Sequence, residues 1–340
     1  MTSVFWAGRA VLGECPLWDS RTGTLYWVDF AAGTVFAQVS GVGHTVAIDV
    51  ETQVSCVGLA EDPQVLIAGL RTGWHLLDLR TGARTFLADP EADRPDCRFN
   101  DGAVDPAGRF WTGSVEDSQA RPVGRLYRLD GDGRYTTVDQ GFRCSNGIDW
   151  SPDGRWMYFV DSGDRVIYRY AFDVESGTIT DREVFVDTSS LQGVPDGLRL
   201  DAAGDIWCAF WGGANVTRFT PGGAVAEVVP VPVLRPSSIA FGGPGLSTMY
   251  ITSASIDLAE DELAEWPLSG AVLSLAASTP GRPAVPFRVA RLTHETQGWT
   301  GGLVVLVLSG WMRFCNGIVA CSVGWAGGWG TMLWCGCRGG

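Results

Sequence analysis

Six positions at a near-constant spacing carry side chains that could act together in one chemical site. Five of the six have a side-chain oxygen and two of these are carboxylates: the positions are Glu14, Val57, Asn100, Asn146, Asp196 and Ser238. Carboxylate and amide oxygens are the ligands that hard divalent cations such as Ca²⁺, Mg²⁺ and Mn²⁺ prefer. If the fold brings the six positions around one axis, they predict a single all-oxygen metal site.

The charges elsewhere in the chain favour a bound cation as the partner of these carboxylates. All 25 basic residues are arginine, and the three histidines (His44, His75 and His294) lie away from the six positions. A carboxylate that faces a narrow apolar channel needs a compensating partner. Zinc remains open but prefers nitrogen and sulfur ligands. The absence of lysine excludes Schiff-base chemistry, and no Gly-x-Ser-x-Gly motif supplies a serine nucleophile.

Turn formation is the alternative explanation for part of this set. Asp-Gly and Asn-Gly dipeptides are typical of tight turns, and they occur here at Asp101-Gly102, Asn146-Gly147 and Asp196-Gly197. Each of the three could therefore be turn chemistry alone. Glu14 precedes Cys15-Pro16, where turn chemistry offers no explanation.

The elements that must position these residues form a sixfold repeat. A short apolar run, a turn rich in Asp, Pro and Gly, and an aromatic or apolar strand recur, with turn markers at Asp19, Asp62, Asp105, Ser151, Asp201 and Gly243. The spacings of 43, 43, 46, 50 and 42 residues leave room for four short strands each, which is the period of a propeller blade. We therefore predict an all-β fold, a six-bladed β-propeller with a metal site in its central channel, in preference to a β-sandwich. We expect an early strand over residues 4–11 to close the last blade.

Composition narrows the classes of partner. The formal net charge of −13 disfavours nucleic acid and anionic membranes, which bind basic surfaces. The apolar run at residues 303–308 is too short to span a bilayer. Nine scattered cysteines and no secretory signal at the start predict reduced thiols and a cytoplasmic location. We expect a small-molecule partner, no nucleic acid or membrane, and a monomer or weak oligomer.

Five motifs, in order, resemble the SMP-30/gluconolactonase/LRE family, which includes regucalcin and bacterial sugar lactonases. They are residues 12–18 (LGECPLW), 98–110 (RFNDGAVDPAGRF), 145–154 (SNGIDWSPDG), 195–198 (PDGL) and 241–243 (FGG) followed by 249–252 (MYIT). The likeness runs from about residue 8 to about residue 290. It implies a six-bladed propeller with one divalent metal ion, Ca²⁺ first, with Zn²⁺, Mn²⁺ or Mg²⁺ as alternatives.

The resemblance also implies roles for individual residues. Glu14, Asn146 and Asp196 are implied as the metal ligands, and Arg98 and Asn100 as residues that hold substrate oxygens. An acidic substrate-binding residue of the third blade corresponds to Glu116 or Asp117; we place it at Glu116, although the spacing leaves both open. Asp101 is expected to support the ligands. Two cysteines, Cys15 and Cys144, stand where the family commonly has other residues, and we expect both to fill core positions.

The function that follows is divalent-metal-dependent hydrolysis of a small sugar lactone to its aldonic acid. A metal can polarise the carbonyl and activate water, and Asp196 is our candidate for the general base. Two alternatives stay open. One is a non-catalytic propeller that binds calcium as a regulator or serves as a scaffold, although the per-blade signatures of WD-type scaffolds are missing. The other is a related propeller esterase or phosphotriesterase, which favours a histidine near the metal.

The composition changes at about residue 291. Residues 291–340 contain five tryptophans, four cysteines and a single acidic residue, Glu295. We predict that residues 1–290 form the propeller and that 291–340 are an atypical tail outside it. Translation of GC-rich DNA in a shifted frame is one explanation of this tail.

Overall fold

The computed structural model describes residues 2–289, 322–325 and 328–331. Its contacts divide the chain into two compact units, Met1–Leu292 and Thr293–Gly340. In the second unit the described residues form one hairpin, β25 (Ser322–Trp325) and β26 (Gly328–Thr331). The predicted boundary at residue 290 and most of residues 291–340 lie outside the described residues, so the origin of the tail stays a prediction.

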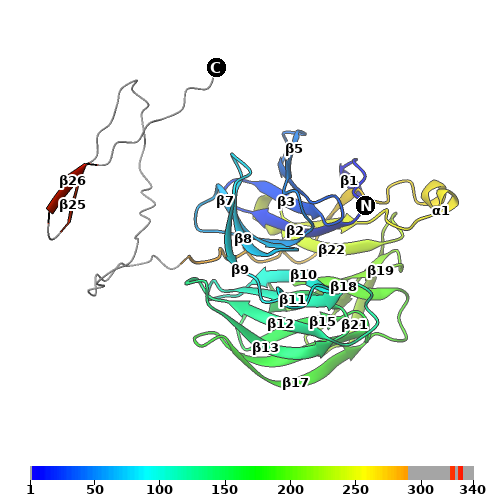
Figure 1. Ribbon diagram of the computed structural model, residues 1–340. Coiled ribbons are helices and arrows are strands. Elements are labelled where there is room, and N and C mark those ends of the chain that lie inside the picture. Colours follow the sequence, from blue (N-terminus) through cyan, green and yellow to red (C-terminus); the bar gives the residue numbers. More distant parts are fainter. Residues whose placement is uncertain (1, 290–321, 326–327, 332–340) are drawn as a thin grey trace. The chain divides into compact units, whose positions relative to one another are not determined.

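The first unit is the predicted all-β propeller, with six sheets of four antiparallel strands (Figure 1). The inner strands are β2 (Gly13–Asp19), β6 (Val54–Leu59), β10 (Cys97–Val104), β14 (Ser145–Trp150), β18 (Val194–Leu200) and β22 (Pro236–Gly242). The second strands are β3 (Thr24–Asp29), β7 (Val65–Leu70), β11 (Phe110–Glu116), β15 (Trp156–Asp161), β19 (Ile206–Trp211) and β23 (Thr248–Ser253). The third strands are β4 (Thr34–Val39), β8 (Gly73–Asp78), β12 (Gly124–Leu129), β16 (Val166–Asp173), β20 (Asn215–Phe219) and β24 (Val272–Ala276). The outer strands are β5 (Thr45–Asp49), β9 (Arg84–Ala88), β13 (Tyr135–Phe142), β17 (Thr178–Asp187), β21 (Val225–Pro230) and β1 (Ser3–Trp6). Blades 1 to 6 are numbered by their inner strands in this order.

The ring is closed by the N-terminal strand. β1 pairs with β24 as the outermost strand of blade 6, with Ser3 opposite Ser274. The predicted closing strand is thus confirmed, although it ends at Trp6 rather than at residue 11. With β1 included, blade 6 has four strands, as each of the other five blades has. Helix is confined to η1 (Pro244–Leu246) and α1 (Glu260–Glu265) within the described residues.

The recurring aspartate of the sequence repeat holds the turn between the first two strands of a blade. The Asp105 carboxylate is fully buried and accepts hydrogen bonds from the Ala107 and Arg109 amides at 2.8 and 3.0 Å. Its Oδ2 accepts the indole N–H of Trp111 at 2.9 Å. Asp201 binds Trp207 in the same way, at 3.1 Å. The repeat is visible in the sequence because one side chain satisfies the turn and anchors a core tryptophan.

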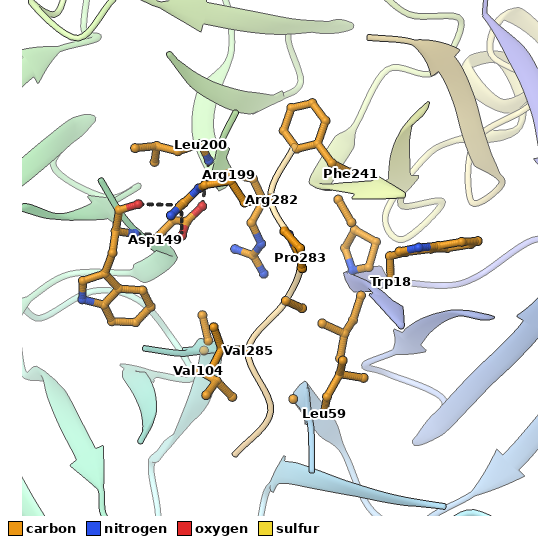
Figure 2. A pocket seen from close by; sticks show the side chains of 18 of the residues that line it. Trp18, Leu59, Val104, Asp149, Arg199, Leu200, Phe241, Arg282, Pro283 and Val285 are labelled. Atoms are coloured by element: carbon orange, nitrogen blue, oxygen red, sulfur yellow. Dashed lines mark hydrogen bonds and ion pairs between the residues drawn. The ribbon is translucent and has the colours of Figure 1, made fainter. Parts of the chain in front are cut away.

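A segment after blade 6 crosses the channel at the end where the inner strands finish. We call residues 280–288 the strap. It bonds to five blades: blade 6 through Leu246, blade 5 through Ala202, blade 4 through Asp149 and Trp150, blade 2 through Leu59 and blade 3 through Gly108. A cavity of about 110 Å³ lies between the strap and all six inner strands, and Figure 2 shows the strap passing through its centre. The strap therefore covers this end of the channel.

Among the described helices, none is both long enough and apolar enough to cross a membrane.

Candidate functional site

The predicted site residues lie at the opposite end of the channel, where the inner strands begin; we call this end the mouth. Strand starts meet around the whole ring through six pairs of residues: Cys15–Val57, Ser55–Phe99, Asn100–Ser145, Gly147–Leu198, Gly197–Ser238 and Ser237–Gly13. These contacts are possible because the inner strands pack directly against one another. All six positions of the repeat lie on inner strands, one in each blade, so the fold arranges them around the channel.

Every inner strand has an irregularity in its pairing with the second strand of its blade. Between Ser145 and Ile148 of β14 lie three steps of chain, opposite two steps between Asp161 and Phe159 of β15. The inner strands of blades 1, 3, 5 and 6 show the same three-against-two pairing, and that of blade 2 shows two against one. A bulge of this kind turns a side chain away from the regular alternation. Asn100, Asn146 and Asp196 lie within their bulges, and Glu14 lies immediately before its own.

The glycines beside these residues permit close packing between blades and do not form turns. Asp101-Gly102, Asn146-Gly147 and Asp196-Gly197 all lie within strands, so the turn explanation is wrong for each. A Cβ atom on Gly197 would lie 2.1 Å from the Ser238 Oγ, and one on Gly147 would lie 2.3 Å from the Leu198 amide nitrogen. Only glycine therefore lets neighbouring inner strands approach this closely.

Amide and hydroxyl groups connect the mouth across three blades. The Arg98 Nη1 donates to the Asn100 Oδ1 at 2.7 Å, and the Asn100 Nδ2 donates to the Asn146 Oδ1 at 3.0 Å. The Asn146 Nδ2 donates to the Ser162 Oγ at 2.7 Å, and this hydroxyl donates to the Pro195 carbonyl at 2.6 Å. Pro195 directly precedes Asp196, so the network links two of the predicted metal ligands. We call it the amide network.

Three carboxylates of the inner strands, Glu14, Asp101 and Asp196, lie close enough for their charges to interact. Burial raises the pKa of Glu14 to about 8, with a further contribution from Asp101. The pKa of Asp196 is raised well above its ordinary value, first by burial and then by Glu14 and Asp101. Burial also raises the pKa of Asp101. One oxygen of Asp196 and one of Asp101 are buried without a hydrogen-bond partner among the described residues.

The unpartnered oxygen of Asp196, with the neighbouring predicted ligands, fits a divalent cation. Two carboxylates, Glu14 and Asp196, and the Asn146 amide oxygen would make a hard ligand set. No group of three or more His, Cys, Asp and Glu side chains in the described part of the chain has a metal-binding arrangement. The predicted set contains only two such residues and an amide. The nearby thiols offer no alternative, because burial raises the pKa of Cys15 and of Cys144 to about 12.

Glu116 and Asp117, the two candidates for the acidic substrate-binding residue, have different hydrogen-bond partners. The Glu116 carboxylate accepts hydrogen bonds from Ser118 and Arg121, which lower its pKa to about 2. The Asp117 carboxylate binds both terminal nitrogens of Arg71, at 2.6 and 2.8 Å, and lies 3.4 Å from the Nε of Arg98. The geometry therefore favours Asp117 over Glu116 as the acid beside the predicted substrate site, and contact of either with substrate stays a prediction.

The Arg98 guanidinium has partners on several sides, and one of its three nitrogens, Nη2, makes no hydrogen bond with the described residues. Its guanidinium stacks on the Phe30 ring at 4.3 Å, and its Nη1 binds the Phe99 carbonyl and Asn100. Its Nη2 makes no hydrogen bond with any described residue. Asn100, by contrast, uses both amide N–H groups, on Ser145 and Asn146. Asn100 can therefore only accept a hydrogen bond from a substrate hydroxyl, whereas Arg98 can donate one.

Sequence reasoning missed two groups around this site. Ser162 joins the amide network but lies just after β15, and no motif marked it. Arg199 lines the channel cavity with Asp149 and Arg282 (Figure 2). Its nearby charge lowers the pKa of Asp101 against the effect of burial. An arginine three residues after Asp196 in a mostly apolar strand was the available signal for this charge.

Comparisons with known proteins agree with this architecture. The sequence model of the SMP-30/Gluconolactonase/LRE-like region matches residues 12–255. The chain is 37% identical to a 6-deoxy-6-sulfogluconolactonase of Pseudomonas putida, over 80% of this chain and 93% of that protein. It is 36% identical to a pentonolactonase of Haloferax volcanii, over 80% and 93% of the two chains. A crystal structure of a calcium-binding protein, regucalcin, from Agrobacterium tumefaciens superposes with a TM-score of 0.81 at 29% identity, covering 84% of this chain and 96% of that one.

Proposed function

Since this chain belongs to the SMP-30/gluconolactonase/LRE-like family, we propose that it hydrolyses a small sugar lactone to the aldonic acid, using one divalent metal ion at the mouth. Relatives that match over most of both chains are named sugar lactonases. The observation that carries the proposal is the mouth itself. There, the buried Asp196 has an oxygen without a described partner, beside a second carboxylate and an oriented amide.

Glu14, Asn146 and Asp196 are the residues that would hold the metal. All three oxygen donors are of the kind that suits Ca²⁺, our first choice, with Mg²⁺, Mn²⁺ and Zn²⁺ as alternatives. When bound, the ion supplies Lewis acidity to the lactone carbonyl and favours deprotonation of water. Its charge would compensate the neighbouring carboxylates of Glu14, Asp101 and Asp196, which raise one another's pKa only in part.

The reaction adds one water across the acyl carbon–oxygen bond of the ring. The water oxygen bonds to the carbonyl carbon, the ring oxygen leaves as a hydroxyl group, and one proton passes from water to that oxygen. Asp196 is our candidate for the general base that accepts this proton from water. The free Nη2 of Arg98 can donate to a substrate oxygen, and Asn100 can accept from a hydroxyl. Both contacts would fix the sugar against the mouth.

A panel of aldonolactones tests this proposal. The metal-stripped protein is assayed with Ca²⁺, Mg²⁺, Mn²⁺ and Zn²⁺ added back singly, on gluconolactone, arabinolactone, xylonolactone, galactonolactone and 6-deoxy-6-sulfogluconolactone. We expect metal-dependent release of acid from one or two of them. Full turnover without any metal would refute the role of the ion, and no turnover on any lactone would refute the substrate class.

A calcium-binding propeller without turnover is the second candidate. The regucalcin structure, described as a calcium-binding protein, favours it. The same panel separates the two functions, because tight Ca²⁺ binding with no acid released from any lactone would support the second.

A further inference from the structure

Ser162 occupies a bridging position between two blades at the mouth. It follows β15 directly, and its side chain is 8% exposed. Its hydroxyl lies 2.7 Å from the Asn146 Nδ2, in blade 4, and 2.6 Å from the Pro195 carbonyl, in blade 5. The residue thus contacts one predicted metal ligand and the backbone that leads into another.

The chemistry of these partners leaves one arrangement of hydrogen atoms. A backbone carbonyl only accepts, so the single proton of Ser162 is committed to Pro195. Toward Asn146 the hydroxyl can then act only as an acceptor. Asn146 must therefore turn its NH₂ group toward Ser162, and its Oδ1 lies on the other side of the amide.

On the side of the Asn146 amide away from Ser162, a hydrogen-bond donor faces the oxygen Oδ1. The Asn100 Nδ2 donates both to the Ser145 carbonyl, at 2.8 Å, and to the Asn146 Oδ1, at 3.0 Å. The Asn100 Oδ1 in turn accepts from Arg98, which has donors only. The Asn146 Oδ1 receives one hydrogen bond and has a second lone pair for a cation.

We propose that Ser162 is a positioning residue that fixes the amide of Asn146 with its oxygen available to the metal and its nitrogen turned away. The inference rests on the proposed function, because it takes Asn146 as a ligand. An amide NH₂ group cannot bind a cation, so an amide turned the other way loses the ligand. Hydrogen-bond partners behind a metal ligand typically change affinity by roughly 10- to 100-fold when removed.

Blade 6 offers a matched control. The Ser253 hydroxyl is also buried, donates to a carbonyl (Ala271, 2.7 Å) and accepts from an N–H group (Gly270, 3.0 Å). It is the last residue of the second strand of its blade, one position from the place that Ser162 takes after β15, and its hydroxyl hydrogen-bonds to no predicted ligand. Ser253→Ala therefore reproduces the loss of a buried hydroxyl without the proposed loss of orientation.

The experiment titrates Ca²⁺, and then Mn²⁺, into the metal-stripped protein by calorimetry. We expect Ser162→Ala to weaken metal binding by roughly 10- to 100-fold. Ser253→Ala should leave it within about twofold, and Ser162→Thr, which keeps the hydroxyl, should restore most of the affinity. Circular dichroism verifies folding, and Ser162→Cys, with its poor acceptor, replaces the alanine variant if that variant does not fold.

A second background separates orientation from packing. In Asn146→Asp both side-chain atoms are oxygens, so orientation no longer matters, and Ser162→Ala should then have a much smaller effect. An equal loss of affinity in both backgrounds, or wild-type affinity in Ser162→Ala alone, would overturn the role of Ser162. Absence of metal binding by the unmodified protein would instead refute the metal in the proposed function, and the inference with it.

Discussion

The Asn100 Nδ2 donates a 3.0 Å hydrogen bond to the Asn146 Oδ1 across the boundary between blades 3 and 4. A predicted substrate residue and a predicted metal ligand are therefore directly coupled. The same amide nitrogen donates a second hydrogen bond to the Ser145 carbonyl, so Asn100 has no free N–H group. Substitutions at Asn100 should consequently alter metal binding as well as substrate binding.

Asp196→Asn should nearly abolish turnover. The change preserves the shape of the side chain but removes the proposed general base, which typically contributes about 10²- to 10⁴-fold to rate. It also removes one of three repelling carboxylates, so the metal-free protein should become more stable while metal affinity falls. Lactonase assays and thermal unfolding measure these effects. Asp132→Asn, at an exposed turn beside Arg134, is the control, and retained turnover in Asp196→Asn would remove Asp196 from its role.

Stability of the metal-free protein should fall as the pH rises. The folded-state pKa of Glu14 is raised from 4.5 to about 8, so in this window the folded protein keeps a proton that the unfolded chain has lost. Folding is then progressively disfavoured between these two values. The raised pKa of Asp196 acts in the same direction. Thermal unfolding in chelator from about pH 5 to about pH 8 measures the decline.

Two additions make the pH experiment specific to the mouth. Saturating metal binds the ionised carboxylates and should abolish the decline, and Glu14→Gln should reduce it. A metal-free stability that stays constant or increases over the same range would contradict the buried carboxylate cluster.

Asp117→Asn should raise KM more than Glu116→Gln does. Asp117 contacts Arg98 and Arg71, whereas Glu116 binds Arg121 and Ser118 on the adjoining loop. Loss of the carboxylate frees the exposed side of Arg98, and we expect KM to rise several-fold with a smaller change in kcat. Steady-state kinetics on the best lactone of the panel decide this. The reverse order of effects would reinstate Glu116, as the sequence interpretation had it.

Arg282→Met should loosen the strap without affecting the mouth. The Arg282 Nη2 binds the Asp149 Oδ1 at 3.1 Å and the Trp150 carbonyl at 2.6 Å, and both charged side chains are largely buried. Loss of these bonds leaves a largely buried carboxylate with fewer partners and should cost about 1–3 kcal/mol of unfolding free energy. Denaturant unfolding measures it. Arg155→Met, which removes an exposed ion pair with Asp153, should cost less than about 0.5 kcal/mol.

The blade repeat and the ring of polar positions could be predicted from sequence because the same short-range contacts recur from blade to blade. Asp105 and Asp201 hold their turns and tryptophans in the same way, so the period is visible without a structure. Ser162 could not be found in this way. Its role depends on a carbonyl 33 residues later, in the next blade, and only the ring brings the two together.

Local spacing also misled at two kinds of position. Asn146-Gly147 and similar pairs have the composition of turns, but the space beside Leu198 decides that glycine is needed for packing between blades. Glu116 is the last residue of β11 and Asp117 follows it, and the two side chains have different partners. A pattern of residue types does not show which face belongs to the mouth.

Closure of the ring by β1 sets the order in which this protein can be completed during synthesis. Ser3 pairs with Ser274, so β1, which is made before the other strands of the propeller, waits for nearly all of them before its partner exists. Contacts between residues so distant in sequence slow folding. The strap, which emerges later still, joins five blades only after all of them have been made. A nascent chain therefore carries β1 as an unpaired strand until β24 has formed, and this strand is the place where a chaperone or a second nascent chain could bind.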